Sequence, residues 1–207
     1  MTPNLLDRPF YNSSFSRHLW ENARDFLKKH AVATGREFTL KSGRKSDFYV
    51  DCRVAALMND GQLRDQKFTV ISRIVQATID FTERETEAAA WAPVPLGGVL
   101  LLLHTEQRIP ALIPRIAQKE HGMKLKVEGL YDASGERLLP EGARVILLED
   151  VITTGGSTIA AAETLRREQL NPIGSVVLVD REEGGRKAIE KEGLNVWPIF
   201  TQSDLRG

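Results

Sequence analysis

The sequence predicts an α/β fold, in which helices flank a mainly parallel twisted sheet and a small hood lies at the N-terminus. Two apolar runs, at 145–148 and 175–179, are continuous rather than alternating, which is typical of strands buried on both faces. From residue 88 onward, strand-like and helix-like segments alternate, and this order favours parallel pairing. We therefore expect a single domain over 1–207, with 1–60 contributing the hood, and with ligands beyond the carboxyl ends of the strands.

The N-terminal part predicts two helices with a pair of strands between them. Residues 1–15 are polar and are expected to be irregular, whereas 16–30 predict a helix because apolar side chains recur on one face. Residues 38–50 predict two short strands around a turn at 42–44. Residues 65–81 form the clearest helix, since an apolar stripe runs along it. That stripe consists of Phe68, Ile71, Val75 and Ile79.

The rest of the chain alternates strands and helices around short connections. Short apolar runs bounded by turn residues favour strands, and longer runs with apolar positions three or four apart favour helices. The expected strands are 88–92, 111–113, 145–148, 175–179 and 195–201. The expected helices are 99–107, 158–169 and 182–192, and the expected connections include a turn at 93–98, an exposed mobile loop at 118–126 and a hairpin at 127–139. Pro198 marks the last strand as an edge strand.

The composition excludes several classes of protein. Lys plus Arg is 28 and Asp plus Glu is 28, so the formal net charge is zero and the chain lacks the basic profile of a general nucleic-acid binder. No apolar stretch approaches the roughly 20 residues that span a bilayer, and residues 1–17 lack the apolar core of a secretory signal. The one cysteine, Cys52, cannot form an internal disulfide. We expect a cytoplasmic protein with no nucleic-acid or membrane partner.

The most informative segment, 145–158, joins a buried strand to a helix through a loop of Thr, Gly and Ser. Glycines let backbone N–H groups point inward around an anion, and the hydroxyls add further donors. The helix N-terminus contributes its unpaired N–H groups and the positive end of its dipole. The loop lacks the Gly-Lys-Ser/Thr of a Walker A motif and the Gly-x-Gly-x-x-Gly of a dinucleotide site. It therefore indicates a site for ribose 5-phosphate rather than for ATP or NAD.

Two adjacent carboxylates, Glu149 and Asp150, stand directly before this loop. A sugar attached to the bound phosphate would lie beside them, and they can accept hydrogen bonds from the two hydroxyls of a ribose. They can also help to hold a hydrated Mg²⁺. The simpler interpretation is a capped helix that follows a strand with two exposed acids. The order of buried strand, paired acids and hydroxyl- and glycine-containing loop is specific and favours the ligand site.

Residues 145–157 resemble the phosphoribosyl pyrophosphate (PRPP) signature of type I phosphoribosyltransferases, and other segments narrow the resemblance to the orotate phosphoribosyltransferases. Residues 38–51 (Phe-Thr-Leu-Lys-Ser-Gly-Arg-Lys-Ser-Asp-Phe-Tyr-Val-Asp) are similar to that family's N-terminal substrate segment. Residues 115–122 resemble its mobile catalytic loop, and 127–129 follow that loop as in the family. Residues 180–185 resemble its later base-binding segment.

The resemblance implies transfer of the 5-phosphoribosyl group from PRPP to orotate, giving orotidine 5′-monophosphate and pyrophosphate in pyrimidine synthesis. It also implies a homodimer with a shared active site, and Mg²⁺ held mainly through PRPP near the carboxylate pair. The implied catalytic residues are Arg115, Lys119, His121 and Asp150. The implied PRPP-binding residues are those four together with Lys41, Leu96, Gly97, Glu149, Val151, Ile152, Thr153, Thr154, Gly155, Gly156, Ser157 and Thr158. The implied orotate-binding residues are Lys41, Tyr49, Val50, Thr153 and Arg181.

Three features depart from the family's pattern. Ile116 stands where a second basic residue usually follows the loop arginine, and Asp47 stands where a proline is common. Residues 93–98 (Pro-Val-Pro-Leu-Gly-Gly) occupy the pyrophosphate loop, in which Pro93 and Pro95 cannot donate a backbone hydrogen bond. Two alternatives therefore stay open. One is a phosphoribosyltransferase for another base, and the other is a non-catalytic sensor that binds PRPP or nucleotides without turnover.

Overall fold

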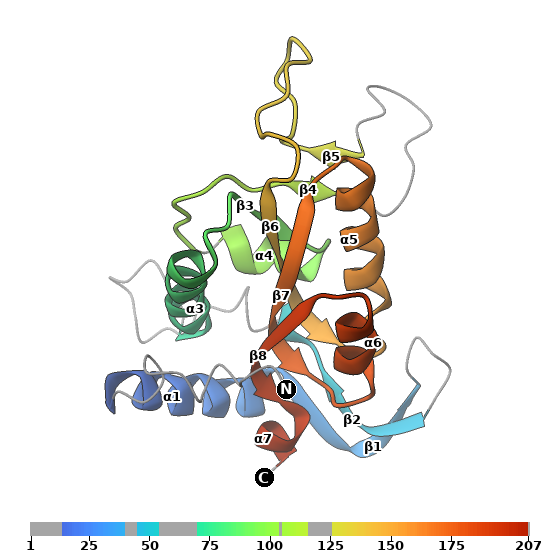
Figure 1. Ribbon diagram of the computed structural model, residues 1–207. Helices are drawn as coiled ribbons and strands as arrows, with labels where there is room; N and C mark the ends of the chain where they lie inside the picture. Colours follow the sequence, from blue (N-terminus) through green and yellow to red (C-terminus); the bar gives the residue numbers. More distant parts are fainter. Residues whose placement is uncertain (1–13, 40–44, 54–69, 104, 116–125, 207) are drawn as a thin grey trace.

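A parallel sheet forms the centre of the computed structural model, which describes residues 14–39, 45–53, 70–103, 105–115 and 126–206 (Figure 1). The sheet has four strands in the order β3-β6-β7-β8, and every neighbouring pair is parallel. The strands are β3 (Ala90–Pro93), β6 (Arg144–Ile152), β7 (Asn171–Asp180) and β8 (Asn195–Thr201). The mainly parallel sheet is therefore confirmed, and Pro198 lies in an edge strand as expected.

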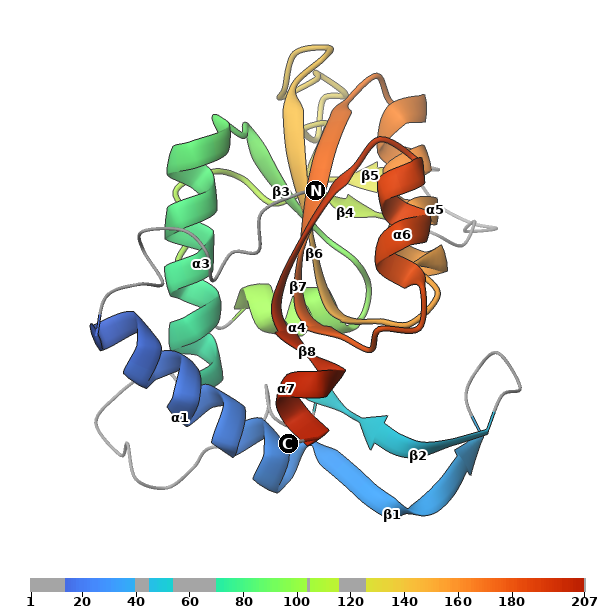
Figure 2. The same ribbon diagram turned by 60° about the horizontal axis from the view of Figure 1, so that its bottom comes forward.

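Helices cover both faces of this sheet (Figure 2). They are α1 (Ser14–His30), α3 (Val70–Thr86), α4 (Gly97–Leu103), α5 (Gly156–Arg167), α6 (Gly185–Lys191) and α7 (Gln202–Arg206). Alternate residues of β6 enter different cores: Ile146 and Leu148 pack with apolar residues of α1, α3 and α4, whereas Val145 and Leu147 pack with residues of α5 and α6. The continuous apolar run is thus buried on both faces, as the sequence predicts.

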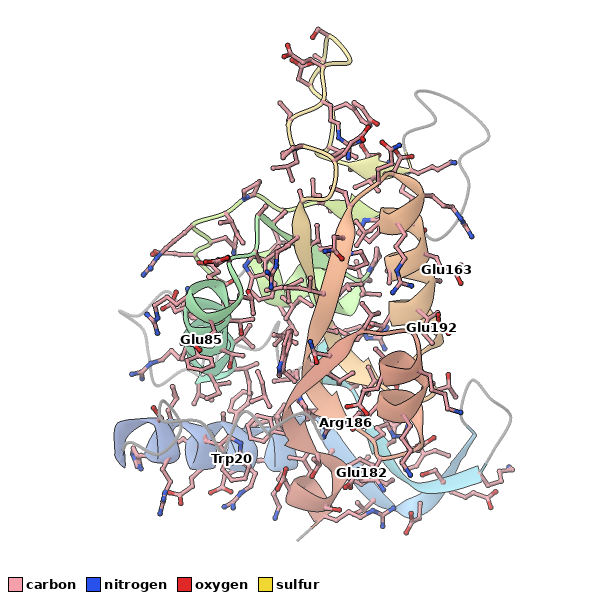
Figure 3. The ribbon with its side chains drawn as sticks, in the orientation of Figure 1. Trp20, Glu85, Glu163, Glu182, Arg186 and Glu192 are labelled. Carbon is pink, nitrogen blue, oxygen red and sulfur yellow. The ribbon has the colours of Figure 1, made fainter. Side chains whose placement is uncertain are left out.

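The N-terminal hood combines α1 with a separate two-stranded sheet. Its strands, β1 (Val32–Thr39) and β2 (Lys45–Val50), pair in antiparallel fashion. Trp20 of α1 donates its indole N–H to the backbone oxygen of Ile199 in β8, with 2.9 Å between the two atoms (Figure 3). This bond ties the hood to the edge of the main sheet.

The C-terminal helix α7, which the sequence analysis does not predict, fastens the hood at a second point. Arg206 pairs with Asp47 of β2, and its guanidinium carbon lies 5.1 Å from the ring centroid of Phe48. At the other end of α7, Ser203 donates its backbone N–H and its hydroxyl to the carboxylate of Glu182, at 2.8 and 2.6 Å (Figure 3). Asp47, which replaces the family's common proline, therefore has a structural partner.

A second small antiparallel sheet follows β3 and α4 along the chain. Its strands are β4 (Ile113–Pro114) and β5 (Val127–Glu128). The hairpin expected over 127–139 is confirmed around its turn, where Tyr131 pairs with Arg137 in antiparallel fashion and Leu138 N–H donates to the oxygen of Leu130 at 2.9 Å, but its first residues, Val127 and Glu128, pair with β4 instead. Beyond β5, Tyr131 bridges Arg137 around a turn in which Asp132 accepts hydrogen bonds from the backbone of Ser134 and Glu136.

Several helix ends differ from their expected positions. α3 continues to Thr86 rather than ending near residue 81, because Phe81 and Thr82 are still buried against the sheet. Its expected start at residue 65 lies outside the described residues. α4 ends at Leu103, earlier than expected, and α6 begins at Gly185 rather than at 182. In the described parts of the chain, no helix has the length and apolar character needed to cross a membrane.

Candidate active site

A cavity of about 610 Å³ opens at the carboxyl ends of β6 and β7. This is the end of a parallel sheet at which ligands are expected. The lining residues are Tyr49, Val50, Asp51, Arg53, Pro95, Leu96, Gly97, Glu149, Asp150, Val151, Ile152, Thr153, Thr154, Gly155, Gly156, Ser157, Thr158 and Arg181. A smaller cavity of about 180 Å³ lies near Arg144 and Asn195, at the opposite end of the sheet, and none of the expected site residues lines it.

The loop at 153–155 turns the chain from β6 into α5. Gly155 has a φ of +80°, and a Cβ atom there would lie 2.9 Å from the backbone oxygen of Gly185, so both conformation and space require glycine. The N–H groups of the first turn of a helix have no acceptor within the helix. Because residues 156–158 line the cavity, these N–H groups and the positive end of the α5 dipole are available to an anion.

Glu149 and Asp150 line the cavity near the end of β6. The Glu149 side chain is buried and accepts a hydrogen bond of 3.2 Å from the Thr158 hydroxyl. Burial, and next the charge of Asp150, raises the pKa of Glu149 well above its ordinary value; burial also raises the pKa of Asp150. The ionised form of such a pair is stabilised when a ligand brings hydroxyl donors or a cation.

The loop at 93–98 packs closely on Asp150. A Cβ atom at Gly97 would lie 2.0 Å from the carboxylate carbon of Asp150, which is too close for any side chain at position 97. The peptide bond between Pro95 and Leu96 is cis. Asp150 is therefore held between the end of β6 and this loop, where it faces the cavity.

The same loop offers few backbone donors to a ligand. The N–H of Val94 donates to the backbone oxygen of Leu148 at 2.8 Å, and the N–H of Gly98 donates to the oxygen of Val94 at 3.0 Å. The two prolines of the loop have no N–H. This leaves Leu96 and Gly97, which both line the cavity, as the backbone donors of the loop.

Arg181, directly after β7, is the buried cation of the cavity, with 3% of its surface exposed. Its Nη2 donates to the backbone oxygen of Phe48 at 2.8 Å and to the Ser46 hydroxyl at 3.2 Å, and it pairs with Glu183 at 2.9 Å. Its Nε is buried and has no hydrogen-bond partner. A buried donor without a partner, in the same cavity as Tyr49, suits a planar ligand that carries carbonyl or carboxylate oxygens.

Comparison with known proteins agrees with this geometry. A family model, the phosphoribosyl transferase domain, matches residues 105–201. An orotate phosphoribosyltransferase of Pyrococcus furiosus is 33% identical over 185 residues, which are 89% of this chain and 93% of that protein. One of Sorangium cellulosum is 36% identical over 189 residues, which are 88% of this chain and 87% of that protein. This chain belongs to the orotate phosphoribosyltransferase family.

A solved structure of the family has the same fold. The orotate phosphoribosyltransferase of Mycobacterium tuberculosis, crystallised in complex with Fe(III) dicitrate, superposes with a TM-score of 0.66 and 28% sequence identity. The match covers 90% of this chain and 98% of that chain. The α/β architecture with its N-terminal hood is therefore the fold of an orotate phosphoribosyltransferase.

Among the described residues that the family resemblance implies for the site, Arg115 does not line this cavity. It lies at the end of β4, and its guanidinium pairs with Glu128 of β5. Lys41, Ile116, Lys119 and His121 lie outside the described residues, as does most of the expected loop at 118–126. The structure thus brings together the expected residues of β2, the 93–98 loop, β6, the phosphate loop and Arg181. The roles of the loop cations stay predictions.

Three lining residues are absent from the sequence-based site: Asp51, Arg53 and Pro95. Asp51 ends the segment that resembles the family's substrate segment, and Arg53 lies two positions beyond it. Their place after a predicted strand is the one signal that could have identified them. Cys52, between them, is fully buried, and burial raises the pKa of its thiol well above the ordinary value. A protonated, inaccessible thiol does not serve as a nucleophile.

Proposed function

We propose that this orotate phosphoribosyltransferase uses the cavity at the ends of β6 and β7 to transfer the 5-phosphoribosyl group from PRPP to orotate. The products are orotidine 5′-monophosphate and pyrophosphate. One observation carries the proposal: the phosphate loop, the carboxylate pair and a buried arginine with an unpartnered Nε all face one space. The loop suits the 5-phosphate of PRPP, the carboxylate pair suits its ribose hydroxyls, and the arginine suits orotate.

The ribose 5-phosphate part of PRPP fits the wall formed by β6 and α5. The hydroxyls of Thr153, Thr154 and Ser157 and the N–H groups of the first turn of α5 would hold the 5-phosphate. Glu149 and Asp150 would then meet the ribose hydroxyls. Thr158 differs from the other loop residues, because its hydroxyl donates to Glu149 and so supports the carboxylate.

Orotate fits the side of the cavity where β2 ends. Backbone groups of Tyr49 and Val50 would read the edge of the pyrimidine, and the Nε–H of Arg181 would donate to a carbonyl or carboxylate oxygen. Phe48 and Ser46 accept hydrogen bonds from Nη2 of the same guanidinium, and Glu183 pairs with that nitrogen too. These contacts leave the buried Nε available to the base.

The reaction needs charge stabilisation and the exclusion of water rather than a covalent nucleophile. Orotate N1 forms a bond to C1 of the ribose while the bond from C1 to the pyrophosphate oxygen breaks. Negative charge leaves with the pyrophosphate, and C1 gains oxocarbenium character. Donors placed where the leaving oxygens gain charge accelerate such a step. A loop that closes over the substrates would keep out water, which would otherwise hydrolyse the sugar.

Mg²⁺ fits this site as an ion carried mainly by PRPP. Mg²⁺ is usually bound through one or two carboxylates together with substrate phosphates and water. Glu149 and Asp150 line the cavity, and the burial that raises the pKa of both carboxyl groups would be offset by a cation beside them. When bound, the ion would neutralise charge on the pyrophosphate oxygens.

The proposal includes a cytoplasmic homodimer with a shared active site. In the family, the loop that carries the residues corresponding to Arg115, Lys119 and His121 closes over the pyrophosphate in the neighbouring subunit's site. Arg115 pairs with Glu128 and does not line this chain's own cavity. This supports a loop that serves the neighbouring subunit's site. The even charge balance and the single cysteine support the cytoplasmic location.

The decisive test follows orotate by its ultraviolet absorbance after purified protein, PRPP and Mg²⁺ are mixed. We expect rapid loss of orotate that depends on all three. A panel of other bases, assayed in parallel, separates the alternatives. Turnover of another base alone would replace orotate as the substrate, and PRPP binding with no turnover of any base would indicate a sensor.

A further inference from the structure

An arginine outside the recognised motifs lies in the cavity. Arg53 follows β2, lines the cavity, and has half of its side chain exposed. Its Nε donates to Oδ1 of Asp51 at 2.9 Å, and its Nη2 donates to Oδ2 of the same carboxylate at 3.0 Å. Asp51 therefore occupies one edge of the guanidinium. The edge formed by Nη1 and the second hydrogen of Nη2 keeps the fork geometry that binds phosphate oxygens in pairs.

Arg53 shares the cavity with the 93–98 loop, the segment that corresponds to the family's pyrophosphate loop. Asp150 and three residues of the 93–98 loop, Pro95, Leu96 and Gly97, line the same cavity as Arg53. Asp150 in turn is packed against Gly97 of the 93–98 loop. The 5-phosphate loop at 153–157 has its own hydroxyl and N–H donors, whereas the 93–98 loop offers few donors.

The pyrophosphate of PRPP needs a cation in this cavity. Pyrophosphate carries several negative charges, while the 93–98 loop offers it the backbone N–H groups of Leu96 and Gly97. Among the described residues that line the cavity, the cations are Arg53 and Arg181. Arg181 is already held by Phe48, Ser46 and Glu183. The Nε donor that Arg181 keeps is assigned above to the base, so Arg53 is the described cavity cation left to bind pyrophosphate.

We infer that Arg53 binds the pyrophosphate group of PRPP through its Nη1–Nη2 edge while Asp51 fixes the opposite edge, an inference that rests on the proposed function. Arg53 would supply, from the hood, positive charge that the catalytic loop lacks at Ile116. Arg53 follows β2, whose Tyr49 and Val50 we assign to the base. Binding of pyrophosphate by Arg53 would therefore also help to position the base-binding segment.

The test compares Arg53→Ala and Arg53→Lys with the wild-type protein by isothermal titration, using Mg²⁺-pyrophosphate and ribose 5-phosphate as separate probes. Arg53→Ala should weaken pyrophosphate binding about ten- to hundredfold, the range expected for the loss of one charge-assisted hydrogen-bonded contact. Ribose 5-phosphate, which lacks the pyrophosphate, should bind as before. Arg53→Lys keeps the positive charge but loses the paired N–H donors. Its affinity for pyrophosphate should lie between those of the wild-type protein and Arg53→Ala. The KM for PRPP should rise in the same order.

Arg167→Ala is the matched control, because Arg167 forms an exposed ion pair with Glu163 on α5 (Figure 3). It should change neither binding constant. An equal loss for both probes in the Arg53 variants, no loss for pyrophosphate, or no pyrophosphate binding by the wild-type protein would each overturn the inference. Orotate turnover by the wild-type protein tests the proposed function separately. Pyrophosphate binding that depends on Arg53 without turnover would leave the inference standing and reject the function.

Discussion

Replacing Gly97 with alanine tests the close packing between the 93–98 loop and Asp150. The added Cβ atom would lie 2.0 Å from the carboxylate carbon of Asp150 and 2.2 Å from each carboxylate oxygen. Favourable carbon contacts are found at about 3.5–4.0 Å, so the overlap exceeds 1 Å. Asp150 is short and lies within β6, so the loop or the strand end must move with it. Overpacking of this kind costs about 1–3 kcal/mol.

Thermal unfolding and orotate consumption should be measured on the same preparation of Gly97→Ala. For a chain of this size, each kcal/mol shifts Tm by about 2–4 °C, so Tm should fall by about 2–12 °C. The same displacement moves a carboxylate that we place at the ribose. A misplacement of about 1 Å can cost about a hundredfold in rate, so kcat/KM for PRPP should fall on that scale.

Gly156→Ala is the matched control for stability. The nearest atom to its added Cβ would be the Thr154 hydroxyl at 3.8 Å, an ordinary contact distance. Alanine at this first position of α5 should leave the free energy of unfolding within about 1 kcal/mol of the wild-type value. If Gly97→Ala kept both the wild-type Tm and the wild-type kcat/KM for PRPP, the close contact between Asp150 and the loop would be refuted.

Three further predictions concern the carboxylates, the base side and the loop. Because burial raises the pKa of Glu149, folding favours its protonated form, so the free energy of unfolding of the ligand-free protein should fall as pH rises from the ordinary carboxyl pKa through the raised one. Urea unfolding between about pH 5 and about pH 8 should show a smaller fall for Glu149→Gln, and an identical pH dependence would contradict the raised pKa. Arg181→Lys keeps the positive charge but loses the planar set of N–H donors, so steady-state kinetics should show the KM for orotate raised about tenfold. Arg186→Lys on α6 is the control, and its KM for orotate should equal the wild-type value. Lys119→Ala should lower kcat about 10²- to 10³-fold with an unchanged Tm, and normal turnover in that variant would remove Lys119 from the mechanism.

The central sheet and the phosphate site could be predicted because their signals are local. The apolar run at 145–148 lies within the longer strand Arg144–Ile152, and its alternate residues enter the cores on the two faces of the sheet. An apolar run without polar residues indicates a strand that is buried on both faces, as happens in a parallel sheet between two layers of helices. Glu149 and Asp150 follow that run, so their place at the ligand-binding end follows from strand direction alone.

The pair of strands on either side of 42–44 could be predicted, but the first part of β1, before residue 38, and helix α7 could not, because their local signals are weak. β1 begins at Val32, contains Gly35 with a φ of +80°, and shifts its register against β2 between Thr34 and Phe38. A register shift of this kind breaks the alternation by which strands are recognised. α7 has five residues, too few for an apolar period, and is held at its start by Asp204, which accepts hydrogen bonds from the N–H and hydroxyl of Thr201.

Contacts between distant positions account for what motifs miss at the site. Asp47 and Arg206 are 159 positions apart, yet their pairing explains an aspartate where the family commonly has proline. Arg53 reaches the cavity for a similar reason, because the end of β2 lies beside the end of β6 and no spacing along the chain links the two. Residues just past the end of a strand meet whatever the tertiary fold brings to that edge. A motif identifies ligand-binding groups that lie within one segment of the chain. A cation that reaches the ligand from another segment, as we infer for Arg53, can be identified only from the tertiary structure.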